Sequence, residues 1–186
     1  MRFDIVITNG AVVTERGIEA VDIAIQNGQI AALLARGTLC ESAETIDATG
    51  LYVIPGAIDI HFHCRAPAYP ERGDFATETR AAAAGGVTTI FEMPISKPCC
   101  ATGDIFRARK ALGAANAYVN FGLYGAPGLL DRSEIADMQA EGAIGWKIFM
   151  TSAPAGRNDE FEGLCLPDVD GLYQAMQLVA ETGLVC

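Results

Sequence analysis

The sequence has little positive charge, only two histidines and no long hydrophobic run. Of its 186 residues, 13 are Lys or Arg and 23 are Asp or Glu, so the formal net charge is −10. Nucleic acids and anionic membrane surfaces are bound through basic patches, which argues against both as partners. No apolar run approaches the roughly 18 residues of a membrane span, and Asp4 interrupts any signal-peptide core at the start. These absences predict a soluble, cytoplasmic protein.

Two sequence patterns are also missing. The six cysteines contain no CxxC pair, and we interpret them as reduced thiols that mostly fill the core. Neither GxGxxG nor GxxxxGK[ST] occurs, so a doubly wound nucleotide-binding module lacks support. What the chain does have is a 51% share of apolar residues against 19% charged ones. This composition predicts a well-buried globular core and excludes a disordered tail.

Residues 1–53 have the pattern of short strands joined by turns. The pairs Asn9-Gly10 and Asn27-Gly28 separate apolar runs, as is typical of β-hairpins. We expect strands at 3–8, 11–14, 21–26, 29–34 and 44–48. This segment is therefore predicted to be part of a small antiparallel β-sandwich.

Residues 54–186 change to an alternation of strands and helices. Strand-like runs occupy 52–63, 87–94, 117–125, 144–150 and 184–186. If the first four strands start near Ala57, Val87, Ala117 and Ile144, their starts recur at roughly 30 residues, which is the period of a βα unit. Regular βα repetition predicts a parallel sheet, either doubly wound or part of a (β/α)8 barrel.

The helices between these strands carry start and stop signals. Asp74 is a plausible N-cap for a helix that ends at Gly85, and a second helix follows Thr102. A third starts at Asp131, with Glu134 as a possible capping-box partner. The fourth has an apolar stripe of Val169, Leu172, Tyr173, Met176 and Val179.

Both histidines lie in the run His61-Phe62-His63 at the end of a predicted strand. Because strand side chains alternate, they share a face with Asp59, whereas Cys64 points to the other face and is left out of any ligand set. Two imidazoles so placed can converge on one cation. The alternative is a pair of hydrogen-bonded structural histidines. Parallel sheets keep their chemistry at the carboxyl ends of strands, which favours the metal site.

Lys147 stands alone in the apolar run IGWKIFM. Lysine is rarely buried without a partner, so one interpretation is an edge strand or a side chain that snorkels along a rim. The functional interpretation is that burial lowers the pKa of the lysine and so favours its neutral amine form. Such an amine can form a Schiff base or capture carbon dioxide as a carbamate, whose two oxygens could bridge two cations.

Several runs together resemble a known family. In order, PGAIDIHFHCRAP, AAAAGGVTTIFEMP and GWKIFM resemble the cyclic amidohydrolases of the amidohydrolase superfamily, which include dihydroorotase, allantoinase and hydantoinase/dihydropyrimidinase. The opening runs also resemble their amino-terminal sandwich segment. The resemblance implies an α/β fold in which residues 54–186 are the first half of a (β/α)8 metal-dependent hydrolase barrel, preceded by the sandwich segment 1–53. It also implies a homo-oligomer, commonly a tetramer.

The resemblance implies roles for four residues. His61 and His63 match the HxH motif that holds the more buried metal, and Lys147 matches the lysine that becomes carboxylated and bridges two divalent ions, usually zinc. Arg65 matches an arginine that helps hold the substrate carboxylate in dihydroorotases. The metal pair would supply hydroxide near neutral pH and polarise the ring carbonyl, so that the cyclic amide opens.

The substrate is less closely defined. Dihydroorotases have the run MPNTRP, whose asparagine binds the substrate carboxylate. This sequence reads MPISKP there, with Ile95 in place of the asparagine and Ser96 after it, and an apolar side chain cannot make that hydrogen bond. The run GAIGWKIFMTSAP is closer to allantoinase or hydantoinase. We therefore expect an allantoin-like or related ureide or imide substrate. Dihydroorotase and hydantoinase/dihydropyrimidinase are the alternatives.

The resemblance also implies that part of the catalytic machinery is missing from these 186 residues. A (β/α)8 barrel needs roughly 250 residues, and the family carries further metal-binding histidines and a catalytic aspartate on later strands. The catalytic base is therefore unknown in this sequence and is expected beyond Cys186, so the chain alone is predicted to be inactive. A non-catalytic scaffold of the same fold is an alternative of another class. The presence of His61, His63 and Lys147 together argues against it.

Overall fold

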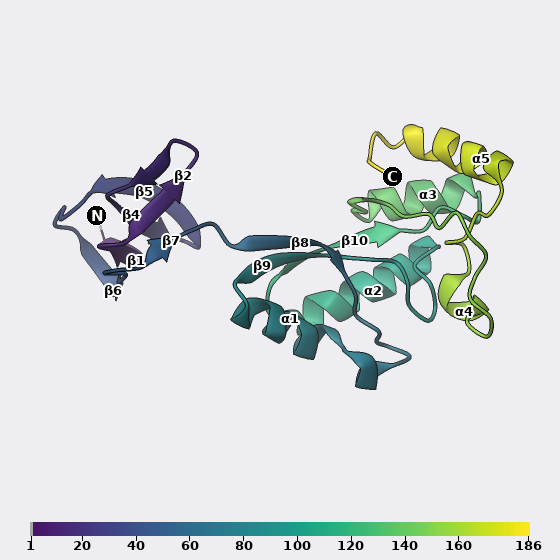
Figure 1. Ribbon diagram of the computed structural model, residues 1–186, viewed down its shortest axis with the longest axis horizontal. Coiled ribbons are helices and arrows are strands. Elements are labelled where there is room, and N and C mark those ends of the chain that lie inside the picture. Colours follow the sequence, from purple (N-terminus) through teal and green to yellow (C-terminus); the bar gives the residue numbers. More distant parts are fainter. Residues whose placement is uncertain (1) are drawn as a thin grey trace. The chain divides into compact units, whose positions relative to one another are not determined.

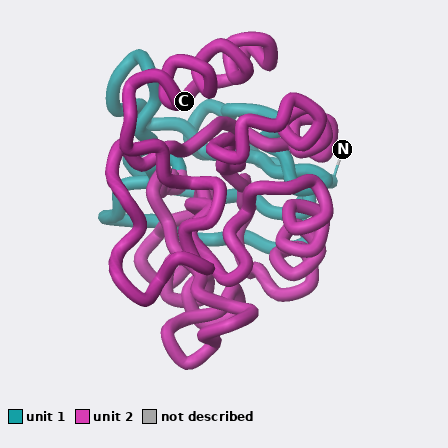
Figure 2. The backbone as a smooth tube through the Cα atoms, turned by 90° about the vertical axis from the view of Figure 1, so that its right-hand side faces the viewer, with its two compact units in different colours: residues 1–55 teal, residues 56–186 magenta. Residues whose placement is uncertain are grey.

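The computed structural model describes residues 2–186 and divides the chain into two compact units. The first unit ends at Pro55 and the second runs from Gly56 to Cys186 (Figure 2). The boundary predicted from the sequence lies between residues 53 and 54. Within residues 2–186, no helix has both the length and the apolar character that crossing a membrane requires.

The first unit consists of two β-sheets. Its strands are β1 (Arg2–Thr8), β2 (Ala11–Thr14), β3 (Gly17–Glu19), β4 (Val21–Gln26), β5 (Gln29–Ala35), β6 (Glu41–Asp47) and β7 (Tyr52–Val53). One sheet has the order β5-β4-β1-β6 and the other β3-β2-β7. The strand positions expected from the sequence are confirmed, with β6 at 41–47 in place of the expected 44–48, whereas β3 is additional to them. Strand β7 is the beginning of the run expected at 52–63, which is interrupted after Val53. That the two sheets form a sandwich stays a prediction.

The purely antiparallel arrangement expected for this unit is wrong. Strand β1 is antiparallel to β4 but parallel to β6, and β2 is antiparallel to β3 but parallel to β7. Asn27-Gly28 makes the expected hairpin, but Asn9-Gly10 takes the chain from one sheet to the other. A Cβ on Gly10 would lie 2.5 Å from Val53 Cγ2, so this turn needs glycine for close approach.

The second unit alternates strands and helices, as the sequence predicts. Its elements are β8 (Ala57–Phe62), η1 (Pro70–Arg72), α1 (Phe75–Ala84), β9 (Val87–Glu92), α2 (Gly103–Asn116), β10 (Asn120–Gly125), α3 (Arg132–Ala140), β11 (Gly145–Trp146), α4 (Asn158–Phe161) and α5 (Val169–Ala180) (Figure 1). The four strands form one parallel sheet in the order β11-β10-β9-β8. This is an α/β unit built on a parallel sheet.

One face of this sheet packs against the helices. Ile90, Leu123 and Trp146 from the strands meet Phe75, Phe106, Ile135 and Met138 from the helices in a single buried cluster. Phe62 of β8 packs against the same cluster. Because strand side chains alternate, the residues on either side of Phe62 are directed to the opposite face. The core thus decides which face of the sheet presents the histidines.

The helix starts follow the sequence signals with one exception. Asp74 caps α1 in a capping box with Thr77, and the Thr102 hydroxyl accepts the Ile105 N–H at the start of α2. Asp131 caps α3, but the capping box expected with Glu134 is wrong. The Glu134 carboxylate instead accepts the backbone N–H of Gly103, 2.8 Å away, and thereby ties α3 to the start of α2.

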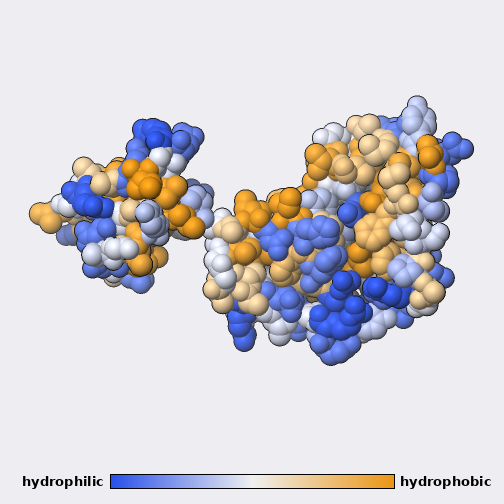
Figure 3. Space-filling model, in the orientation of Figure 1, coloured by the Kyte–Doolittle hydropathy of each residue, from blue (hydrophilic) through white to orange (hydrophobic). Residues whose placement is uncertain are grey.

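The buried face of α5 matches the stripe expected from the sequence only in part. Gly171, Ala175 and Val179 are buried, whereas Val169 and Tyr173 are 74% and 64% exposed. Apolar side chains accordingly gather on the surface of the part of the second unit that carries α3 and α5 (Figure 3). Periodicity identifies an apolar face of the helix, but it does not predict that the small residues Gly171 and Ala175 pack inward beside Val179.

The last two expected strands are shorter than predicted. The run 144–150 contains only the two residues of β11, and 184–186 forms no assigned strand. The Trp146 N–H nevertheless donates to the Val185 carbonyl at 2.9 Å, so this terminal segment lies beside β11. Beyond Lys147 the chain leaves the sheet, and Phe149 forms an isolated parallel bridge with Cys165.

Candidate metal centre

The two histidines lie at the carboxyl end of β8. His61 is exposed and His63, directly after the strand, is half-buried. Their ring centres are 5.3 Å apart with the planes tilted by 58°. Two imidazoles bound tetrahedrally to one zinc by bonds of about 2.1 Å would have ring centres about 5 Å apart. The pair therefore fits the spacing that a shared cation requires.

His63 has a buried nitrogen with no partner. Within residues 2–186, three buried side-chain polar atoms lack a hydrogen bond, and they are His63 Nδ1, Arg65 Nη1 and Arg109 Nη1. Burial first, then the positive charges of Arg65, His61 and Lys147, lower the pKa of His63 to about 4. The ring is thus neutral near pH 7, which is the form that binds a metal. An unpartnered neutral imidazole is the strongest sign of a missing ligand here.

Lys147 is held on the same face of the sheet. It follows Trp146, whose ring is in the core, so the lysine is directed away from the helices. Its Nζ lies 5.2 Å from the centre of the Phe149 ring, and its backbone N–H donates to Gly125. Lys147 and the histidines come from opposite edges of the sheet, and its charge contributes to the lowered pKa of His63.

The described residues do not complete a metal site by themselves. Counting His, Cys, Asp and Glu, residues 2–186 contain no group of three that could hold an ion. Asp59 shares the strand face with the histidines, but its Oδ1 accepts the backbone N–H of His61 at 2.9 Å. Cys64 is fully buried in the helix-side core, where burial raises the pKa of its thiol.

Arg65 is the second residue with an unpartnered donor. Its backbone N–H donates to the Gly73 carbonyl at 2.9 Å, which places it in the loop between β8 and α1. Burial, followed by the charges of Arg72 and Arg157, lowers the pKa of Arg65. A half-buried guanidinium whose Nη1 has no partner can donate to a carbonyl or carboxylate oxygen.

A buried ion pair behind the histidines is not anticipated from the sequence. Glu92 at the end of β9 and Arg109 on α2 have side chains that are 1% and 4% exposed. The guanidinium binds both carboxylate oxygens, with Nε 2.9 Å from Oε2 and Nη2 on Oε1. A signal is present, because both charges interrupt otherwise apolar positions: Glu92 follows the run VTTIF, and Arg109 shares a helix face with Ile105 and Phe106.

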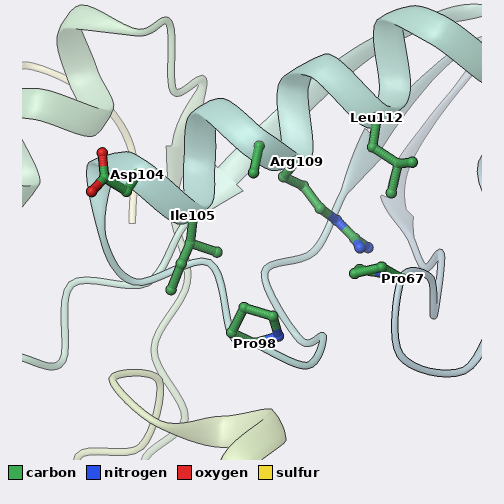
Figure 4. Close-up of a pocket in the computed structure, with 7 residues that line it drawn as sticks. Pro67, Pro98, Asp104, Ile105, Arg109 and Leu112 are labelled. Atoms are coloured by element: carbon green, nitrogen blue, oxygen red, sulfur yellow. The ribbon is translucent and has the colours of Figure 1, made fainter.

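An apolar cavity is lined in part by Arg109. It has a volume of about 400 Å³ and is lined by Pro67, Pro98, Asp104, Ile105, Ala108, Arg109 and Leu112. Figure 4 shows the Arg109 side chain extending from α2 toward Pro67, in the loop that comes after the histidines. None of the predicted site residues lines this cavity, so it is distinct from the candidate metal centre.

Hydantoinases and allantoinases are among the proteins of known sequence and structure that this chain resembles. The chain is 36% identical to an L-hydantoinase of Paenarthrobacter aurescens and 38% identical to an allantoinase of Rubrobacter xylanophilus, over 98% of its own length in each case. It spans 39% and 38% of those two relatives. A solved L-hydantoinase (dihydropyrimidinase) from Arthrobacter aurescens superposes with a TM-score of 0.87 at 35% identity, covering 98% of this chain and 40% of that one. No protein-family model matches the sequence.

Proposed function

This chain belongs to the cyclic amidohydrolase family, whose amino-terminal portion it matches, and on that premise we propose that the protein is a metal-dependent hydrolase that opens a ring amide. The observation that carries the proposal is the buried, unpartnered Nδ1 of His63 beside the ring of His61. Both lie at the carboxyl end of a parallel strand, where such sheets hold their chemistry. The sheet is proposed to be the first half of a (β/α)8 barrel.

His61 and His63 would hold the first of two divalent ions, which we propose to be zinc, and carboxylated Lys147 would bridge the pair. The metal pair supplies, when bound, a nucleophile near neutral pH and polarisation of the ring carbonyl. Among this chain's own residues, neutral His63 offers its lone pair without first losing a proton. Arg65 would orient the substrate through its free Nη1.

We propose an allantoin-like ureide or a hydantoin as the substrate. Relatives named allantoinase and L-hydantoinase support this class. Ile95 is 6% exposed and packs in an apolar cluster with Cys99 and Phe161, so it offers no hydrogen bond to a carboxylate. Dihydroorotase remains the second candidate, because the unpartnered guanidinium of Arg65 is suited to a substrate carboxylate.

The catalytic base is proposed to come from outside this sequence, and the 186-residue chain is expected to be inactive alone. Its two histidines leave a second ion without an imidazole ligand. Homo-oligomeric assembly, as a tetramer, is proposed from the family resemblance. A non-catalytic scaffold is the alternative, and it predicts that the histidines bind no metal.

Zinc titration of the chain by calorimetry tests the metal site. We expect binding that is lost in His61→Asn and in His63→Asn, with the fold retained by circular dichroism. Arg107→Met, an exposed change on α2, is the matched control and leaves binding unchanged. Zinc binding that survives both histidine changes would contradict the proposed site.

A chimera tests the substrate. The chain would replace the matching residues of the L-hydantoinase of Paenarthrobacter aurescens, and ring opening would be followed with allantoin, hydantoins and dihydroorotate. We expect activity on allantoin or hydantoins that disappears with Lys147→Met. A soluble, zinc-loaded chimera that opens only dihydroorotate would contradict the proposed substrate class and favour the second candidate.

A further inference from the structure

The buried pair of Glu92 and Arg109 does more than join β9 to α2. Burying two charges is costly, and replacing such a pair by apolar residues is often neutral or stabilising. Its presence is therefore weak evidence of a purely structural role. What distinguishes this pair is the third group that it holds.

That third group is the backbone of Cys64. The Cys64 N–H donates to Glu92 Oε1 at 3.2 Å, and Arg109 Nη2 donates to the Cys64 carbonyl at 2.5 Å. One ion pair thus binds both polar backbone groups of a single residue. The Cys64 side chain is fully buried in the core, so this residue is fixed from three directions.

His63 lies between this anchor and a second one. The Phe62 carbonyl accepts the N–H of Met93 at 2.9 Å, and the regular pairing of β8 with β9 is shifted between Asp59 and Phe62. The strand therefore ends irregularly just where the histidine begins. Without the Cys64 anchor, the nearest backbone hydrogen bonds on either side of His63 would be that of the Phe62 carbonyl and that of the Arg65 N–H with Gly73.

Arg109 is itself held in place from other sides. Its guanidinium lies over the Phe75 ring at 5.3 Å from the centre, and the side chain extends from α2 toward Pro67 in the loop after the histidines (Figure 4). The planar fork of arginine can bind a carboxylate through two nitrogens while one of them also donates to a carbonyl. Lysine, a single point charge, cannot reproduce that arrangement.

We propose that Glu92 and Arg109 are positioning residues that orient the His63 ring for a metal by fixing the backbone of Cys64. Neither residue touches the metal or the substrate. The inference rests on the proposed function, since it presumes that His63 is a ligand. Partners of this kind behind a metal ligand alter affinity by about 10- to 100-fold when they are changed.

The main test is the double variant Glu92→Leu/Arg109→Met, which removes both charges at once. Because no buried charge is left unpaired, we expect the unit to stay folded, with unfolding followed by circular dichroism. Zinc affinity, measured by competition with a coloured chelator, should fall about 10-fold or more. Arg107→Met, which removes an exposed arginine from the same helix, should leave zinc affinity unchanged.

A second readout needs no metal. With histidine labelled at the ring Cε1, the chain gives one ¹H–¹³C signal for each of His61 and His63, since these are its two histidines. We expect the His63 signal of the double variant to shift and broaden while the His61 signal stays. The conservative variant Arg109→Lys should show the same change if the double variant fails to fold.

The outcomes separate the two claims. A folded double variant with wild-type zinc affinity and an unchanged His63 signal would overturn the positioning role and leave the proposed function intact. A wild-type chain whose histidines bind no zinc would overturn the proposed function. In that case the His63 signal would still test the positioning role, because a shifted and broadened signal in the metal-free double variant shows that the pair fixes the ring.

Discussion

Two buried acidic residues, one in each unit, show how structural and functional polar groups differ. Asp22 in the first unit is 3% exposed, and its two oxygens accept the N–H groups of Asn9 and Gly37, each at 3.0 Å. Glu92 in the second unit is equally buried, but its partner Arg109 keeps an unpartnered nitrogen. In residues 2–186, the three buried polar atoms without a partner all belong to the second unit, on His63, Arg65 and Arg109. Satisfied groups hold the first unit together, whereas unsatisfied ones gather around the candidate site of the second.

The largest expected effect is on the stability of the second unit. Arg109→Ala leaves the Glu92 carboxylate buried without its counter-charge, and we expect a loss of about 3–5 kcal/mol in the free energy of unfolding. Urea unfolding followed by Trp146 fluorescence reports on this unit alone, because the sequence has one tryptophan. A loss below about 1 kcal/mol would show that the pair is not needed to balance the buried charge.

A smaller effect is expected in the first unit. Asp22→Ala leaves the N–H groups of Asn9 and Gly37 without this acceptor, and because both hydrogen bonds are only partly buried, we expect each to cost about 1 kcal/mol. Limited proteolysis followed by mass spectrometry should show earlier cleavage within residues 2–55 of the variant than of the wild type. Asp4→Ala, in an exposed position that also accepts hydrogen bonds, is the matched control. Equal cleavage of the two variants would show that the buried Asp22 stabilises the first unit no more than the exposed Asp4 does.

His63 should behave in the opposite way to Asp22. Since its Nδ1 gains no hydrogen bond from the fold, His63→Leu removes an unmet polar group, and we expect stability within about 1 kcal/mol of the wild type. Zinc binding should be lost in the same variant. A loss of several kcal/mol in chemical denaturation would instead mark His63 as a structural residue.

The smallest effect concerns the thiols. Burial raises the pKa of Cys99 to about 12, and the buried thiols of Cys64 and Cys100 are shifted in the same direction. At pH 8 these groups stay protonated and unreactive in the folded chain. We expect a thiol reagent to modify Cys186 first and these three only after unfolding, as mass spectrometry would show. Rapid modification of Cys64 would mean that the region behind the histidines opens readily.

The sequence predicts the order of strands and helices along the chain better than it predicts which strands pair and which helix faces are covered. Strand and helix periodicity locates the βα units, and Asp74 and Thr102 mark helix starts because capping is local chemistry. The hairpin predicted at Asn9-Gly10 is wrong because a turn motif says that the chain reverses, not which strand pairs next. The partly exposed stripe of α5 has the same cause, because a sequence shows that a helix has an apolar face but not which part of that face another element covers.

The candidate site is predictable only as far as its residues lie on one strand. His61 and His63 share a face by alternation, and the structure gives them a spacing that suits one cation. That Lys147 shares their face depends on Trp146 filling the core, which is a tertiary contact. Arg109 escapes prediction because a charge within a helical pattern is ordinarily solvated, and only its contact with Glu92 explains its burial.

The most direct test of the central claim is the ¹H–¹³C spectrum of the two histidine rings during a zinc titration of the wild-type chain. Both signals should move together with one apparent affinity, because both rings would bind the same ion. If one signal moves alone, or if neither responds while the chain is folded, His61 and His63 are not a shared metal site and the proposed function loses its support.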